Sequence, residues 1–342
     1  MARQIEFFHP EPLPRTGRVW PVFLPFAGCP HRCLFCAQDR QTGRDATTLR
    51  DAHDSLASDL ESTRAAGRGP YELAFYGGTF TALPEPWPET FLALAARFRG
   101  AGLITRVRCS TRPDCADPAT LDRLRARGLD MVELGVQSFD DGALAASGRG
   151  YCGETARQGC QAVREAGLAL GIQLLPGLPG DRPGVFRRDA GIVADLAPEI
   201  ARLYPCLVVR GTGLAQEWER GRYAPWTLER TREELALALP VLWARGVRVV
   251  RLGLAPEVTL EESILAGPWH PALGQSVRGL ALLRLVEDAV LRLGARPTRL
   301  EVPRRYQGEL FGHGGELRGA YAAMGLSGRA VRYVDTPGFV LA

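Results

Sequence analysis

The stretch Phe26–Arg40, FAGCPHRCLFCAQDR, holds three cysteines in close succession. Three residues separate Cys29 from Cys33, and two separate Cys33 from Cys36. The stretch follows an apolar run, Val19–Phe26, that is typical of a buried strand. Thiols this close together in one loop indicate a metal site or catalytic thiols rather than a disulfide framework.

The composition is that of a globular protein in a reducing compartment. Eight cysteines in 342 residues are too few for a disulfide scaffold, and a formal charge of +4 is too small to require a nucleic-acid partner. The sequence has no apolar run long enough to span a membrane, and its first residues lack the apolar core of a signal peptide. We therefore expect a cytoplasmic protein.

Beyond the cysteine loop, strand and helix patterns alternate regularly. Strands separated by helices of this length predict parallel pairing with right-handed crossovers. With Val19–Phe26 as the first strand, we expect an α/β fold with six or seven βα units: a partial (β/α)6-type TIM-like barrel with a small C-terminal α+β extension. The other predicted strands are Tyr71–Tyr76, Leu103–Cys109, Met131–Val136, Leu168–Leu175, Ala201–Val209 and Val247–Leu254. The predicted helices between them are Asp45–Ala66, Glu85–Arg99, Asp117–Arg127, Asp141–Ala146, Glu154–Ala166, Val185–Leu196 and Thr227–Ala244.

The regular alternation ends near residue 255, which predicts three parts. Residues 1–255 are assigned to the barrel. Residues 256–297 are expected to form an irregular loop over the barrel mouth and a helix over Val277–Leu293. Residues 298–342 are assigned to a small α+β tail.

Short turns rich in glycine or polar residues follow five of the predicted strands. Active sites of such barrels gather at the carboxyl ends of the strands, so we expect these turns and the cysteine loop to lie on one face. The turns are Gly77–Thr79, Ser110–Pro113, Gly135–Ser138, Leu174–Gly177 and Tyr204–Cys206.

The number of thiols bears on which metal the loop binds. Structural zinc takes four ligands, and the nearest imidazole, His31, lies inside the first gap. Iron–sulfur clusters are also normally held by four cysteines. Three cysteines on a four-iron cluster would leave one iron open to an external ligand. A zinc knuckle or incidental buried thiols remain the alternatives at this point.

The C-x3-C-x2-C spacing, with Phe35 before the last cysteine, resembles the signature of the radical SAM superfamily. That resemblance implies a [4Fe-4S] cluster whose open iron binds the amino and carboxylate groups of S-adenosylmethionine (SAM). One electron then breaks the sulfonium C–S bond and yields a 5′-deoxyadenosyl radical, which abstracts hydrogen from the substrate. The family's chemistry also implies an electron donor such as flavodoxin or ferredoxin.

Further motifs in order along residues 20–255 resemble the radical SAM domain of the catalytic Elongator subunit, which modifies wobble uridine in tRNA. A segment with GVQSF and GR is shared more distantly with oxygen-independent coproporphyrinogen oxidase. The Elongator subunit continues into an acetyltransferase domain, which we expect this chain to lack. The motifs are YGGTF, STRPD, ELGVQSFDD, SGRGY, QLLPGLPGD, LYPCLVVRGTGL and VRVVRLG.

The resemblance assigns roles to residues at the strand ends. The three cysteines would bind the cluster, and the turn Gly77, Gly78 and Thr79 would hold the methionine end of SAM. Serine and glutamine can hydrogen-bond to ribose hydroxyls, and an arginine can pair with the SAM carboxylate. The residues in these positions are Ser110, Gln137, Arg149 and Gln173.

Four residues are candidates for the substrate side: Tyr204, Cys206, Arg210 and His270. Cys206 replaces a threonine of the relative, so its thiol is a candidate to face the active site. The alternative is that Cys206 is small apolar filler, as we expect for Cys109, Cys115, Cys152 and Cys160. His270, in GPWHP, is equally compatible with a role as a loop anchor.

The tail has the element order of a KH-type RNA-binding core. In KH domains a G-x-x-G loop clamps the nucleotide backbone, and here Gly312 and Gly315 form such a motif. The nearby arginines Arg304, Arg305 and Arg318 are suited to phosphates. A plain glycine-rich helix connection is the alternative, because Glu309 and Glu316 dilute the positive charge.

The leading hypothesis from the sequence is a radical SAM enzyme that acts on RNA, with tRNA as the expected substrate. One alternative keeps this chemistry but takes a small metabolite or a tetrapyrrole as substrate. The other alternative is a non-catalytic iron–sulfur or zinc protein.

Overall fold

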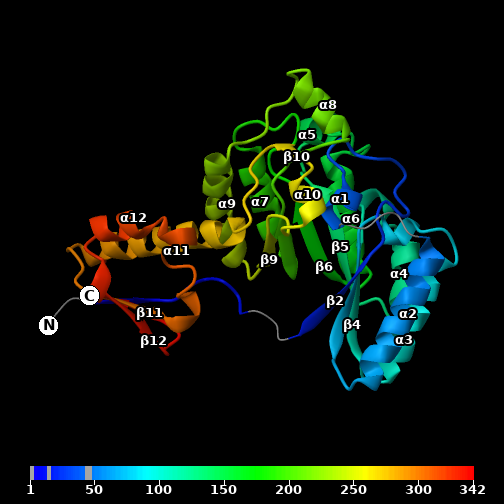
Figure 1. Cartoon of the computed structure of the whole chain (residues 1–342), viewed down its shortest axis with the longest axis horizontal. Coiled ribbons are helices and arrows are strands. Elements are labelled where there is room, and N and C mark those ends of the chain that lie inside the picture. Colours follow the sequence, from blue (N-terminus) through cyan, green and yellow to red (C-terminus); the bar gives the residue numbers. More distant parts are fainter. Residues whose placement is uncertain (1–3, 14–16, 43–47) are drawn as a thin grey trace.

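The computed structural model describes residues 4–13, 17–42 and 48–342. Its centre is a curled sheet of seven parallel strands that pair in chain order, with helices on the convex side (Figure 1). This half-barrel confirms the predicted fold class. The strands are β2 (Arg18–Phe23), β3 (Tyr71–Tyr76), β4 (Ile104–Thr111), β5 (Met131–Gln137), β6 (Ala169–Leu174), β7 (Ile200–Leu203) and β9 (Arg248–Leu252).

The predicted strand over Ala201–Val209 is divided in the structure. Strand β7 ends at Leu203, and the two-residue strand β8 (Val208–Val209) instead pairs antiparallel with β10 (Ile264–Ala266). Pro205 lies between the two strands and has no backbone N–H to donate to a neighbouring strand. The chain therefore leaves the sheet at Tyr204 and turns across the mouth of the half-barrel.

The helices follow the predicted order. Helix α2 has Thr48 as its N-cap, which accepts from Asp51 N, and the predicted start at residues 45–47 lies outside the described residues. Helix α8 (Gly213–Glu219) was not predicted. The helices that cover the sheet are α2 (Leu49–Ala65), α3 (Trp87–Gly100), α4 (Pro118–Ala126), α5 (Asp141–Ala146), α6 (Gly153–Glu165), α7 (Val185–Leu196) and α9 (Leu228–Trp243).

Alternation along the strands separates the two faces of the sheet. On β5, Val132, Leu134 and Val136 are buried in the main hydrophobic core. The intervening residues Glu133 and Gln137 point to the concave side, because successive side chains of a strand face opposite sides. The concave face is therefore polar, and it carries the candidate site at the carboxyl ends of the strands.

The last fifth of the chain builds most of a second, smaller unit beside the half-barrel (Figure 1). Helix α10 (Val258–Glu261) lies at the half-barrel, where its Leu260 packs with Ala37, Leu207 and Val209. The long helix α11 (Leu273–Leu293) packs under a four-stranded sheet of the small unit. The order of that sheet is β1–β13–β11–β12, so the N-terminal strand β1 (Ile5–Phe7) belongs to it. The other strands are β11 (Leu300–Pro303), β12 (Val331–Val334) and β13 (Phe339–Leu341).

Ring packing joins the small unit to the half-barrel. The imidazole of His9 lies between the rings of Trp243 and Tyr306, at centroid distances of 4.8 and 4.6 Å. Burial lowers the pKa of His9 to about 3, so the ring is neutral. Among the described residues, no helix is both long and apolar enough to cross a membrane.

The turn with the G-x-x-G motif packs against α11. A Cβ atom on Gly279 of α11 would lie 2.6 Å from the Glu309 carbonyl oxygen and 3.0 Å from Gly312 Cα. The Glu316 carboxylate accepts from Ser276 Oγ at 2.6 Å and pairs with Arg232 at 2.9 Å. These contacts place Gly312 inside the unit, while the short helix α12 (Arg318–Ala323) follows on the surface.

Candidate active site

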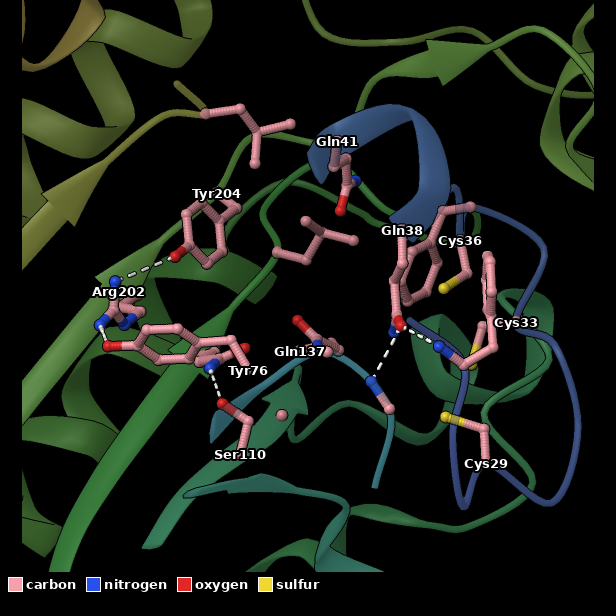
Figure 2. A pocket seen from close by; sticks show the side chains of 18 of the residues that line it. Cys29, Cys33, Cys36, Gln38, Gln41, Tyr76, Ser110, Gln137, Arg202 and Tyr204 are labelled. Atoms are coloured by element: carbon pink, nitrogen blue, oxygen red, sulfur yellow. Dashed lines mark hydrogen bonds between the residues drawn. The ribbon is translucent and has the colours of Figure 1, made fainter. Parts of the chain in front are cut away.

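A cavity of about 420 Å³ opens at the carboxyl ends of the parallel strands. Figure 2 shows the cysteine loop on one side of it and Tyr76, Arg202 and Tyr204 on the other. The volume lies within the range of about 300–1,000 Å³ typical of small-molecule sites. The predicted residues that line it are Cys29, Cys33, Cys36, Gly77, Gly78, Ser110, Gln137, Arg149, Gln173, Tyr204 and Cys206.

The cysteine loop is locked onto the turn after β3 by close backbone contacts. Thr79 N donates to the Ala27 carbonyl oxygen at 2.7 Å. A Cβ on Gly78 would lie 2.1 Å from that oxygen, and one on Gly28 would lie 2.4 Å from the Thr79 carbonyl oxygen. Gly78 also has a φ of +60°, which favours glycine. No residue larger than glycine fits at these two positions without moving the loop.

Gln38, which the sequence analysis missed, ties the same two segments together. It begins helix α1 (Gln38–Thr42), two residues after Cys36. Its Oε1 accepts from Phe26 N at 2.6 Å and from Gly78 N at 2.8 Å. One side-chain oxygen thus joins the start of the cysteine loop to the turn after β3. The sequence carried no signal for this role, because the partners lie 12 and 40 residues away.

We expect Gln38→Ala to loosen the cysteine loop. The substitution leaves the N–H groups of Phe26 and Gly78 without this acceptor, which costs about 1–3 kcal/mol for a buried donor. The expected result is a lower melting temperature and less iron retained per chain after anaerobic desalting. Gln38→Glu keeps an acceptor oxygen in place and is expected to retain most of the iron. Equal iron retention in Gln38→Ala and the unsubstituted protein would contradict this role.

Two arginines lie against the sulfur of Cys33. Arg149 Nη1 donates to Cys33 Sγ at 3.1 Å, and Arg112 Nη1 lies 3.7 Å from the same atom. The Asp114 carboxylate holds Arg112 through two hydrogen bonds of 2.9 and 2.7 Å. Arg149 was predicted to pair with the SAM carboxylate, whereas here it contacts the cysteine, the Gly135 carbonyl oxygen and Tyr151. Both guanidinium groups therefore hold the sulfur of Cys33 in place.

The thiols fit a metal cluster. Burial, and then the neighbouring Cys33 and Cys29, raise the pKa of Cys36 to about 12. Such a thiol ionises when a metal replaces its proton. Within the described ranges, no group of three or more histidine, cysteine or acidic side chains is arranged to hold a single metal ion. Three thiols that line one cavity are the ligand type that iron–sulfur clusters take.

The residues predicted to contact SAM differ in their hydrogen bonds, backbone conformation and burial. Gln173 Nε2 donates to Ser110 Oγ at 3.3 Å, which places these two polar groups side by side. Gln137 has a φ of +70°, and such non-glycine conformations cluster at functional sites. Thr79 is not among the residues that line the cavity; it is fully buried, with its hydroxyl 3.3 Å from Cys29 Sγ. Its contacts position the cysteine loop.

The wall opposite the cysteines is built on Arg202, another residue that the sequence analysis missed. Arg202 Nη2 donates to the Tyr76 hydroxyl at 2.6 Å, and Nη1 donates to the Tyr204 hydroxyl at 3.3 Å. Its Nε donates to the Glu133 carboxylate at 2.6 Å, which fixes the guanidinium. The alternation of arginine with apolar residues in the strands was the signal that could have identified this concave polar wall.

The other predicted substrate residues lie in different surroundings. Cys206 lines the cavity but is 1% exposed, and burial raises the pKa of its thiol to about 12. Arg210 and His270 are not among the lining residues. Arg210 N donates to the Ser263 carbonyl oxygen at 2.7 Å, and His270 Nδ1 accepts from Ala272 N at 3.0 Å. The His270 ring also packs edge-on against His313 at 5.1 Å.

Known proteins resemble this chain over about two thirds of its length. The tRNA uridine(34) acetyltransferase of Methanocaldococcus infernus is 28% identical over 266 residues, covering 66% of this chain and 50% of the relative. Elongator complex protein 3 of Schizosaccharomyces pombe is 28% identical over 269 residues, covering 65% and 49%. The chain thus spans about half the length of these curated relatives.

A solved structure shares the fold. Archaeal Elp3 from M. infernus, with an N-terminal deletion, superposes with a TM-score of 0.58 at 21% identity, covering 84% of this chain and 67% of that one. Two family models also match, the radical SAM superfamily over residues 23–187 and the radical SAM C-terminal domain over residues 198–280. The first contains the cysteine loop and the next four strands, and the second contains Arg202 and Tyr204. The chain therefore belongs to the radical SAM superfamily of enzymes.

Proposed function

We propose that this enzyme binds a [4Fe-4S] cluster through Cys29, Cys33 and Cys36 and uses it to cleave SAM reductively. When bound, the cluster would supply one electron to the sulfonium, so that the C–S bond breaks to methionine and a 5′-deoxyadenosyl radical. The electron would come from an external donor such as flavodoxin or ferredoxin. The observation that carries this proposal is the shared cavity, which joins the three cysteines to the strand ends.

The residues of the cavity divide into three roles in this proposal. Backbone groups of Gly77 and Gly78 would receive the methionine end, because glycines let a ligand approach the chain closely. Ser110 and Gln173, which already hydrogen-bond to each other, would bind the ribose hydroxyls. Arg149 would act chiefly on Cys33 and position its sulfur through the hydrogen bond from Nη1.

The proposed substrate is RNA, and tRNA in particular. The support comes from the relatives, which are named as a tRNA uridine(34) acetyltransferase and an Elongator complex protein. Tyr76 and Tyr204 offer aromatic faces at the wall opposite the cysteines, on which an unpaired base could stack. The tail would add a phosphate contact through Arg318, which is exposed on the small unit.

The test is anaerobic reconstitution with iron and sulfide, followed by dithionite and SAM. We expect the protein to bind about four irons and to release 5′-deoxyadenosine. Added tRNA is expected to raise the yield of 5′-deoxyadenosine, because hydrogen abstraction from substrate draws the cleavage forward. A yield that tRNA leaves unchanged would count against RNA and favour a small metabolite. A protein that takes up zinc but no iron would contradict the cluster itself.

A further inference from the structure

A second cavity, of about 890 Å³, lies at the opposite end of the half-barrel. It is lined by residues at the amino-terminal ends of the strands, including Val19, Glu72 and Arg248, and by Arg278 of α11. Arg305, Tyr306 and Glu309 of the small unit close it from the other side. The proposed SAM chemistry makes no use of this space.

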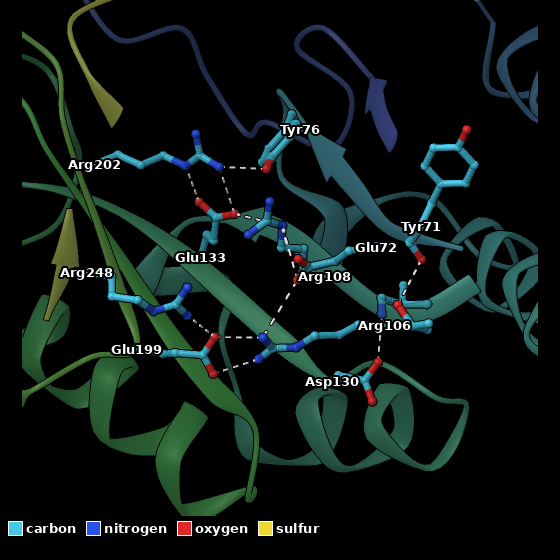
Figure 3. Close-up of polar contacts among 12 residues, drawn as sticks. Tyr71, Glu72, Tyr76, Arg106, Arg108, Asp130, Glu133, Glu199, Arg202 and Arg248 are labelled. Carbon is cyan, nitrogen blue, oxygen red and sulfur yellow. Dashed lines mark hydrogen bonds and ion pairs between the residues drawn. The ribbon is translucent and has the colours of Figure 1, made fainter. Parts of the chain in front are cut away.

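Positive charge predominates around the second cavity. Seven arginines line it against four glutamates, and Glu133 adds one more carboxylate behind the wall. Part of this charge is paired within the fold (Figure 3). Arg106 binds the Glu199 carboxylate through bonds of 2.7 and 2.9 Å, and Arg248 shares the same carboxylate at 2.8 Å. Arg278 pairs with Glu11.

Arg108 is incompletely satisfied although it is buried. It is 6% exposed, and its Nε has no hydrogen-bond partner among the described residues. The nearest carboxylate oxygens belong to Glu133, at 3.5 Å, and to Glu72, at 3.7 Å. A buried cation is costly unless it is paired and hydrogen-bonded, so further acceptors would stabilise this group.

Two more guanidinium groups that line the cavity form no ion pair with a described residue. Arg251 Nε donates to the Gly253 carbonyl oxygen at 3.2 Å, and Arg305 donates to the Tyr306 hydroxyl. Neither has a carboxylate within 4 Å in the part of the chain that the structure describes. They come from different units, because Arg251 is on β9 and Arg305 follows β11.

We propose that the second cavity binds a small organic anion that carries phosphate or carboxylate groups. The guanidinium fork matches the oxygens of either group, and a ligand with two anionic groups would neutralise arginines from both units. Tyr76, Arg202 and Arg251 line this cavity and the SAM cavity alike. A bound anion would therefore lie next to the wall that the proposed function assigns to the substrate.

The test is calorimetric titration of the anaerobically reconstituted full-length chain with pyrophosphate and, separately, with citrate. We expect at least one of them to bind with a dissociation constant below about 1 mM, and the better probe distinguishes phosphate from carboxylate ligands. Arg305→Gln is expected to weaken that binding about tenfold, because it removes one charge-assisted fork. Arg251→Gln, a substitution on β9, is also expected to weaken the binding of that probe.

Arg304→Gln is the matched control. Arg304 is the adjacent residue of the same turn, is exposed, pairs with Asp335 at 2.9 Å and is not among the residues that line the cavity. Its loss is expected to change the affinity by less than about twofold. The absence of binding by both probes at about 1 mM would overturn the proposal. An equal loss of affinity in Arg304→Gln and Arg305→Gln would overturn it as well. Neither outcome depends on SAM cleavage, so the proposed function is tested separately.

Discussion

Cys36→Ala is expected to retain at most about a tenth of the iron and to form no detectable 5′-deoxyadenosine, a loss of at least about a hundredfold. The reason is that a cluster held by three thiolates has no spare protein ligand. Cys36 lies in the cavity beside Cys33 and Cys29, and both of them help to raise the pKa of its thiol. Iron per chain, the visible absorption of the cluster and 5′-deoxyadenosine yield measure the effect.

Cys115→Ala is the control for that experiment. Cys115 is half-buried in the turn after β4, near the cysteine loop, but is not among the residues that line the cavity. We expect this variant to keep its iron and its activity. Loss of iron in Cys115→Ala would show that a fourth thiol takes part. Full iron content in Cys36→Ala would show that the loop is not the cluster site.

Gly78→Ala is expected to reduce 5′-deoxyadenosine formation by at least about tenfold, through displacement of the cysteine loop. The new methyl group would lie 2.1 Å from the Ala27 carbonyl oxygen and 2.8 Å from that of Leu24, so the backbone has to move. A displaced loop would hold the reacting groups out of line, and a misplacement of about 1 Å can lower a reaction rate by about tenfold or more. The measurements are 5′-deoxyadenosine yield and the apparent affinity for SAM.

Gly67→Ala separates the steric effect from backbone strain. Gly67 has a φ of +63°, close to the +60° of Gly78, but nothing lies within 4 Å of its Cβ position. In both variants an alanine in the left-handed conformation lowers the free energy of unfolding by about 1–2 kcal/mol, so both melting temperatures should fall. Only Gly78→Ala is expected to lose activity beyond that shift. Equal activity in the two variants would contradict the tight contact between turn and loop.

The parallel strands were predictable because each depends mainly on its own residues. The apolar runs of β3 and β5 and the helix α7 lie at or within a residue of their predicted bounds. The strand predicted over Ala201–Val209 was too long, because local apolar character continued past Pro205 while the hydrogen bonding did not. The N-terminal strand β1 escaped prediction, since its partner β13 lies at the other end of the chain.

The sequence identified many of the residues that line the cavity, but not the side chains that hold its walls in place. The three cysteines and the strand-end residues could be identified because spacing and order along the chain reveal them. Gln38 and Arg202 could not, because each acts through partners that the fold brings from distant strands and turns. Thr79 and Arg149 were found by position, but their contacts with Cys29 and Cys33 appear only in three dimensions.

The sequence by itself determined the cysteine spacing and the regular alternation of strands and helices. The class of fold, and the end of the sheet at which the candidate site lies, follow from these two features. These features follow from local periodicity and from covalent distance along one loop. The tertiary structure alone decided which oxygen holds the loop to the turn and which arginines reach Cys33. It also decided that a second, positively charged cavity forms where the small unit meets the half-barrel. The physical reason is that such contacts join segments far apart in the chain, whose approach depends on the packing of the whole molecule.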